Sequence, residues 1–153
     1  MKRSNYFKTL GASLLALSMT LFSQQGLAEQ KITQGKYEVH YNAFNSTFLQ
    51  PKVAQSYGIK RGKTRGLLNV SVLEKQADGS TKPVVAVLNG KATNLTSQVQ
   101  PLEFRQIRET NALYYIAEYA FTDDQVLRFN VQVQPDPNSA AANIKFEQRF
   151  YAD

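Results

Sequence analysis

Apolar and polar residues alternate along most of the chain after Lys36, and this is the period of a β-strand with one buried face. The phase of the alternation shifts at Ile107, which is typical of a β-bulge. The run Val84–Leu88 is almost continuously apolar and indicates a strand covered on both faces. The pattern predicts about seven strands, near residues 37–41, 68–72, 84–88, 102–107, 113–121, 127–133 and 144–150.

Turn-forming residues separate these strands. Asp78-Gly79-Ser80 and Asn89-Gly90 have the composition of hairpin turns. One short helix is predicted, which begins at Pro51 and ends before Gly58. The segment before the first strand, Glu29–Gln34, is predicted to be a loose leader.

Strands with one apolar face bury it by stacking two sheets. The sequence therefore predicts an all-β fold, an antiparallel β-sandwich that is immunoglobulin-like in the broad sense, as a single domain over residues 29–153. The chain has neither Cys nor Trp, which excludes the antibody subclass. A small closed β-barrel is the alternative, because alternation alone does not separate the two.

The first 28 residues have the pattern of a bacterial signal peptide. The apolar run Leu10–Phe22 has 13 residues, whereas a membrane-spanning helix needs about 20. Small residues then precede Glu29, so we predict cleavage between Ala28 and Glu29 and a location in the periplasm. The run is preceded by three cations: Lys2, Arg3 and Lys8.

Cleavage would leave 125 of the 153 residues and lower the net charge from +6 to +3. Such a mild excess gives no reason to expect a nucleic-acid partner. Gly58–Thr64 imitates a phosphate-binding loop, but it has three residues between its glycines where the motif needs four, so no nucleotide is predicted. The absence of cysteine excludes disulfides and thiolate metal sites, and no cofactor is predicted.

The residues offer little for catalysis. His40 is the only histidine, so zinc would lack a second imidazole ligand and a catalytic thiol is missing. No G-x-S-x-G nucleophile motif occurs, and Ser46 follows His40 by six residues without a recognisable context. We therefore predict no catalytic residue and no metal ligand, and expect a protein that is not an enzyme.

Two segments are candidates for binding. In His40–Leu49, aromatic rings interleave with amides and hydroxyls, which suits a polar ligand or a partner, although the same groups equally suit the tethering of an irregular loop. A cluster of four cations follows and suits an anionic surface at about 1 kcal/mol per cation, or about millimolar affinity in total; a solvated loop is its alternative. The candidates are His40, Asn42, Phe44, Asn45, Thr47 and Phe48 for a ligand or partner, and Lys60, Arg61, Lys63 and Arg65 for an anionic surface.

Several segments of the chain resemble domain-of-unknown-function family 4426, a family of small exported bacterial proteins. The resemblance implies a single periplasmic β-rich domain and supplies no activity, cofactor or catalytic residue. It rests on residues 37–59 (YEVHYNAFNSTFLQPKVAQSYGI), 65–73 (RGLLNVSVL), 102–109 (LEFRQIRE), 112–121 (ALYYIAEYAF) and 146–153 (FEQRFYAD).

The leading hypothesis for function is a non-catalytic periplasmic β-sandwich that binds a protein or another component of the envelope. Its edge strands and the two candidate segments would make the contacts. The first alternative is a module for a small polar ligand, built on His40–Leu49. The second alternative is an enzyme of unrecognised type, with His40 as its base.

Overall fold

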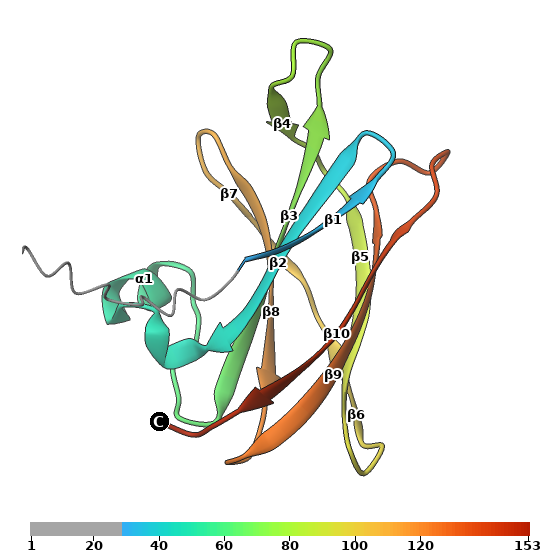
Figure 1. The fold of residues 1–153 in the computed structure, drawn as a ribbon. Coiled ribbons are helices and arrows are strands. Elements are labelled where there is room, and N and C mark those ends of the chain that lie inside the picture. The colour runs from blue at the N-terminus through green and yellow to red at the C-terminus, as the bar shows by residue number, and fades with distance from the viewer. Residues whose placement is uncertain (1–28) are drawn as a thin grey trace, which may run out of the picture.

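The computed structural model describes residues 29–153. The predicted signal peptide, residues 1–28, lies outside the described residues, and so does the Ala28 side of the predicted cleavage junction. The described chain folds into two antiparallel sheets that stack face to face (Figure 1). The predicted β-sandwich is confirmed, and the sheets do not close into a barrel.

The larger sheet has six strands in the order β1-β2-β3-β8-β7, and β4 pairs with the end of β3. Its long central strands carry alternating residues, so one side of each faces the core and the other faces outward. These strands are β1 (Gln30–Gln34), β2 (Tyr37–Asn45), β3 (Arg65–Lys75), β4 (Thr81–Pro83), β7 (Arg105–Arg108) and β8 (Leu113–Ala120).

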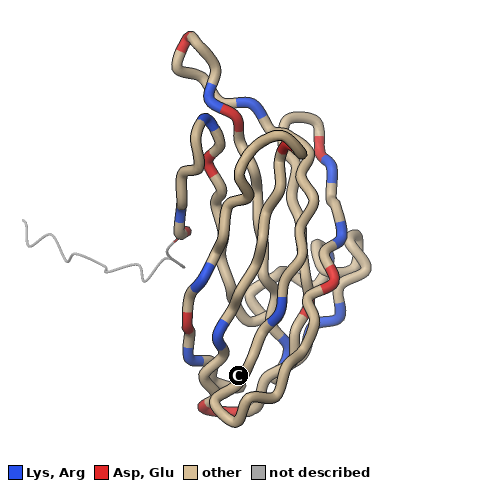
Figure 2. The backbone as a smooth tube through the Cα atoms, turned by 90° about the vertical axis from the view of Figure 1, so that its right-hand side faces the viewer, with Lys and Arg blue, Asp and Glu red and all other residues tan. Residues whose placement is uncertain are grey.

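The smaller sheet has four strands in the order β10-β9-β5-β6. Figure 2 views the molecule from this side and shows Lys and Arg spread around the described chain, with acidic residues among them. The strands are β5 (Val87–Asn94), β6 (Val99–Leu102), β9 (Gln125–Gln134) and β10 (Ala142–Phe150).

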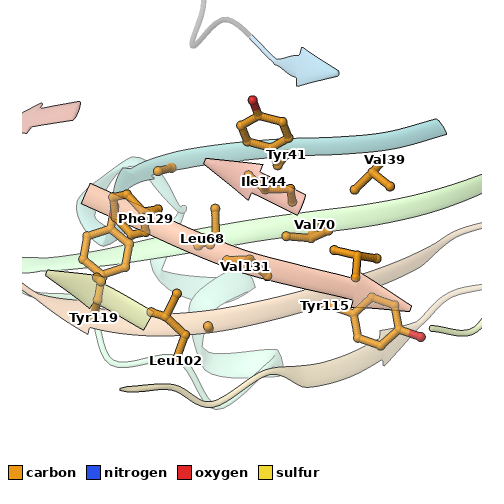
Figure 3. Packing of buried hydrophobic residues seen from close by; sticks show 14 of the residues in the cluster. Val39, Tyr41, Leu68, Val70, Leu102, Tyr115, Tyr119, Phe129, Val131 and Ile144 are labelled. Atoms are coloured by element: carbon orange, nitrogen blue, oxygen red, sulfur yellow. The ribbon is translucent and has the colours of Figure 1, made fainter. Parts of the chain in front are cut away.

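The core lies between the sheets and is built from the inward phase of each strand (Figure 3). Leu68 and Val70 of β3 face Phe129 and Val131 of β9, and all four are buried. Phe129 also stacks on Phe146, with ring centroids 4.6 Å apart. Because the chain has no disulfide, this packing and the hydrogen bonds of the two sheets hold the fold together.

A short helix, α1 (Pro51–Ser56), confirms the predicted helix and lies against the outer face of the six-stranded sheet (Figure 1). Ala54 of the helix and Ile59 of the following loop pack on Leu67, which points away from the main core. A 3-10 turn, η1 (Ser46–Phe48), connects β2 to this unit. None of the helices in residues 29–153 is long and apolar enough to cross a bilayer.

The structure has ten strands where the sequence predicted about seven, and the differences lie at the sheet edges and crossovers. The predicted loose leader is wrong, because residues 30–34 form β1 and Ile32 lies opposite Val39 of β2. The prediction of a doubly covered strand at Val84–Leu88 is also wrong. There the chain crosses from β4 to β5, and Val87 is 72% exposed.

The phase shift that was predicted as a β-bulge at Ile107 instead reflects a crossover between the sheets at residues 103–104. The structure divides the predicted strand into β6 of the small sheet and β7 of the large sheet, so the inward phase is reset between them. The predicted hairpin turn at Asn89-Gly90 is wrong, because both residues lie within β5 and Gly90 is opposite Val131. The other predicted turn, at Asp78-Gly79-Ser80, does connect β3 to β4, and Gly79 adopts a φ of 86° there.

Candidate functional site

The loop after α1 forms one wall of a charged hollow with a volume of about 390 Å³. Gly58 turns the chain out of the helix with a φ of 63°, a conformation that favours glycine. The loop then returns to the sheet at Arg65, the first residue of β3. The hollow is lined by Gly58, Lys60, Arg65, Pro101, Glu103, Arg105 and Glu118.

Glu118 of β8 lies between two guanidinium groups in this hollow. Arg65 Nη2 donates to Glu118 Oε2 at 3.0 Å, and Arg105 Nη2 lies 3.4 Å from Glu118 Oε1. Arg105 also donates through Nη1 to the carbonyl oxygen of Tyr57 at 3.0 Å, which ties β7 to the end of α1. Each arginine is thus held in place by a neighbouring element.

The hollow retains unused donors. A guanidinium has five N–H groups, and Arg65 uses one of them on Glu118, while its buried Nε has no partner among the described residues. Lys60, a third cation, forms no ion pair within residues 29–153. Three cations against two carboxylates, Glu103 and Glu118, suit a small oxyanion such as a carboxylate or a phosphate.

The four cations predicted as an anionic-surface site do not form one site in the structure. Lys60 and Arg65 line the hollow, whereas Arg61 turns the other way and donates through Nη2 to the carbonyl oxygen of Thr47 at 2.9 Å. Lys63 is exposed between them. Sequence reasoning missed Arg105 and Glu118, because only the pairing of β3, β8 and β7 places them beside Arg65.

The six predicted ligand or partner residues do not converge on one site either. His40, Asn42 and Phe44 alternate with core residues of β2 and therefore lie on the outer face of the six-stranded sheet. Asn45 instead holds the end of the chain, through Nδ2 bonds to the Tyr151 carbonyl oxygen at 2.8 Å and to Asp153 Oδ1 at 3.2 Å. Thr47 Oγ1 donates to the other carboxylate oxygen of Asp153, and Phe48 is exposed.

His40 lies between two carboxylates. Its Nε2 is 3.4 Å from Glu38 Oε2 and its Nδ1 is 3.4 Å from Glu29 Oε1. Glu38 also contacts Lys75 at 2.9 Å and Lys31 at 3.4 Å. The hydrogen bond from Lys75, assisted by His40 and Lys31, outweighs the opposing effect of burial and lowers the pKa of Glu38 to about 2.

The hydroxyl of Ser46 has a structural role in the described chain. It is buried, accepts from Gly62 N at 2.9 Å and donates to Gly62 O at 3.1 Å, and so fastens η1 to the basic loop. No group of three His, Cys, Asp or Glu side chains within residues 29–153 is arranged to hold a metal ion.

The described chain is therefore an antiparallel two-sheet β-sandwich with a small covering helix and a charged hollow beside that helix. It belongs to the family named Domain of unknown function (DUF4426), whose sequence pattern matches residues 31–153. A crystal structure of a DUF4426 family protein from Pseudomonas aeruginosa PAO1 is 38% identical, with a TM-score of 0.70, and the match covers 82% of this chain and 96% of that one. None of the curated proteins matches this chain.

Two more distant neighbours have the same fold. One is FetP of uropathogenic Escherichia coli strain F11, recombinantly expressed in the periplasm of E. coli BL21(DE3), with 12% identity and a TM-score of 0.54 over 83% of this chain and 99% of that one. The other is a copper-bound variant of the same FetP, with 12% identity and a TM-score of 0.52 over 82% and 91%. At this identity the likeness shows the fold alone.

Proposed function

We propose that this protein is exported to the periplasm and acts there as a non-catalytic binding module, which holds an anionic group of an envelope component in the hollow beside α1. The proposed ligand chemistry is an oxyanion, either a phosphate or a carboxylate. The observation that carries the proposal is the pair Arg65 and Arg105, both fixed on Glu118 and joined by Lys60 in one hollow.

The arrangement favours binding because the donors are already in place. Arginine side chains lose considerable conformational entropy when a ligand orders them. Here Glu118 and the Tyr57 carbonyl oxygen hold both guanidinium groups before any ligand arrives. A planar guanidinium also matches the two oxygens of a carboxylate or phosphate, which a lysine cannot do.

Export is supported by the pattern of residues 1–28 and by the exported character of the family that the sequence resembles. The FetP neighbour was expressed in the periplasm, which agrees with that location. We do not propose that this chain binds copper as the FetP variant does, because residues 29–153 contain one histidine and neither cysteine nor methionine. A non-catalytic role is supported by the sequence, which has no G-x-S-x-G nucleophile motif and no cysteine.

A titration of the folded protein with inorganic phosphate and with acetate at low salt tests the proposal, followed by NMR or calorimetry. The variant Arg65→Gln/Arg105→Gln is expected to bind either anion at least about tenfold more weakly, since two charge-assisted bonds are lost. The control is Arg128→Gln, which removes a cation of the other sheet that pairs with Glu147 at 2.7 Å.

The variant Glu118→Gln tests whether Glu118 competes with a bound anion for the two arginines. It keeps an amide oxygen that can accept from the arginines but removes the negative charge that competes with a ligand, so we expect it to bind phosphate more tightly than the parent. Unchanged phosphate affinity in the double arginine variant, or an equal loss in the Arg128 control, would reject the hollow as the site.

A further inference from the structure

We infer that the anionic group belongs to a lipid surface, and that the protein docks on it through the end of the sandwich that presents Phe48 next to the basic loop. This inference rests on the proposed function and names the partner of the same site. The loop that contributes Lys60 and Arg65 to the hollow also contacts the segment of Phe48, through Arg61 and Gly62.

Phe48 is 64% exposed although its neighbours are held in place. On one side, Thr47 accepts a bond from Arg61 through its carbonyl oxygen and donates one to Asp153 through its hydroxyl. On the other side, Leu49 packs against the cluster formed under α1. The backbone is therefore anchored on both sides of Phe48, and its ring projects outward from a fixed position.

Two more exposed apolar side chains belong to the same end of the molecule. Val53 lies in the first turn of α1, directly after the Phe48 segment. Tyr151 follows β10, and its carbonyl oxygen is bound by Asn45 at 2.8 Å. Aromatic side chains at the interface between water and lipid place an apolar ring among the headgroups, and both Phe48 and Tyr151 suit that position.

The charges around Phe48 complement anionic headgroups. Lys52 lies in the first turn of the helix that follows it, and Lys60, Arg61 and Lys63 belong to the loop that is bonded to Ser46 and Thr47. The acid in direct contact with this segment is Asp153, whose two oxygens are occupied by Asn45 and Thr47. Cations at about 1 kcal/mol each together with one inserted ring give binding that is reversible, as expected for a peripheral contact.

A bilayer offers phosphates at its surface and hydrocarbon just below it, which matches cations beside the exposed rings of Phe48 and Tyr151. The same loop thus brings together the two chemistries that a lipid surface recognises. A bilayer with anionic lipid is therefore the occupant that these contacts favour.

The absence of tryptophan from the chain allows a direct test. Phe48→Trp introduces a single indole at the proposed contact. We expect its emission to shift to shorter wavelength with phosphatidylglycerol vesicles at low salt, and not with phosphatidylcholine vesicles. The control is Val87→Trp, because Val87 is 72% exposed and begins β5 at the opposite end of the sandwich.

A second variant separates this inference from the proposed function. Phe48→Ser is expected to weaken the affinity for phosphatidylglycerol vesicles, measured by sedimentation, by about tenfold. This factor corresponds to the free energy of burying roughly half of a phenylalanine ring. The variant's binding of soluble phosphate should equal that of the parent. If phosphate still binds in the hollow while Phe48→Trp shows no shift, or if the Val87 control shifts equally, the lipid inference is wrong and the proposed function stands. If the parent protein itself binds neither phosphate nor acetate, both the lipid inference and the proposed function are wrong.

Discussion

Two buried tyrosines of β8 differ in what their hydroxyl groups contact, and this allows a sharp test of the packing. Tyr115 and Tyr119 are four residues apart on the same strand, and both point into the core with 5% and 4% of their surface exposed. The Tyr115 oxygen accepts a hydrogen bond from the backbone N–H of Ala86 at 2.8 Å. The Tyr119 oxygen is buried without a partner among the described residues, and burial raises its pKa.

Replacement of each tyrosine by phenylalanine should therefore change stability in opposite directions. Tyr115→Phe leaves the Ala86 N–H without its acceptor at the crossover between the sheets, and we expect a loss of about 1–3 kcal/mol in the free energy of unfolding. Tyr119→Phe removes a hydroxyl that was desolvated without compensation, so we expect a gain of about 1 kcal/mol. The ring of Tyr119 keeps its edge-on contact with Phe129, at 5.0 Å between centroids.

Urea unfolding, monitored by circular dichroism of the sheets, gives both free energies from the midpoint and the slope. A gain of 1 kcal/mol corresponds to a rise of about 4 °C in the melting temperature of a domain of this size. Both variants remove one oxygen atom from the same strand, so each serves as the control for the other. Equal losses in the two variants would refute the reasoning about the unpartnered hydroxyl.

Two further predictions concern the six-stranded sheet. Gly66 lies opposite Tyr119, whose ring occupies the space that a Cβ atom at position 66 would need. Gly66→Ala should therefore lower the free energy of unfolding, measured in urea, by about 1–3 kcal/mol. The same substitution made in the Tyr119→Leu variant should cost less. The pKa of Glu38 falls from an ordinary value of 4.5 to about 2, so the Lys75 contact stabilises the fold above pH 4.5 and is lost toward pH 2. The difference in urea unfolding midpoint between the parent and Lys75→Met should therefore become smaller as the pH falls from 4.5 to 2. A difference that stays constant over this range would contradict a stabilising contact between Lys75 and ionised Glu38.

The long strands of the fold were predictable because their alternation is a local property of the chain. The buried face of each strand follows from the positions of its apolar residues, such as Val39 and Tyr41 in β2 or Val131 and Val133 in β9. The crossovers were not predictable in the same way. Val84–Leu88 is apolar on every position, yet Val87 becomes exposed because the chain leaves one sheet and joins the other there, and only the tertiary arrangement decides this.

The site was predictable in part for a similar reason. Lys60 and Arg65 belong to one basic segment that the sequence shows directly. Arg105 and Glu118 are ordinary polar positions of two other strands, and they join the hollow through the register of β3, β8 and β7. No short-range pattern distinguishes them, because a lone charge on the outer phase of a strand is the common case.

The bond between Asn45 and the Tyr151 carbonyl oxygen joins residues that are 106 positions apart. Loop closure over that length is slow, and it requires β10 to have taken its place beside β9. A chain in which β10 has not yet paired would therefore lack the contacts of Asn45 and Thr47 with the C-terminal residues, and contacts such as those of Arg61 and Leu49 would be left to hold the Phe48 segment. The position of Phe48 is therefore completed only when the last strand has folded, and if Phe48 contacts lipid as inferred, an incompletely folded chain should bind vesicles more weakly than the folded protein.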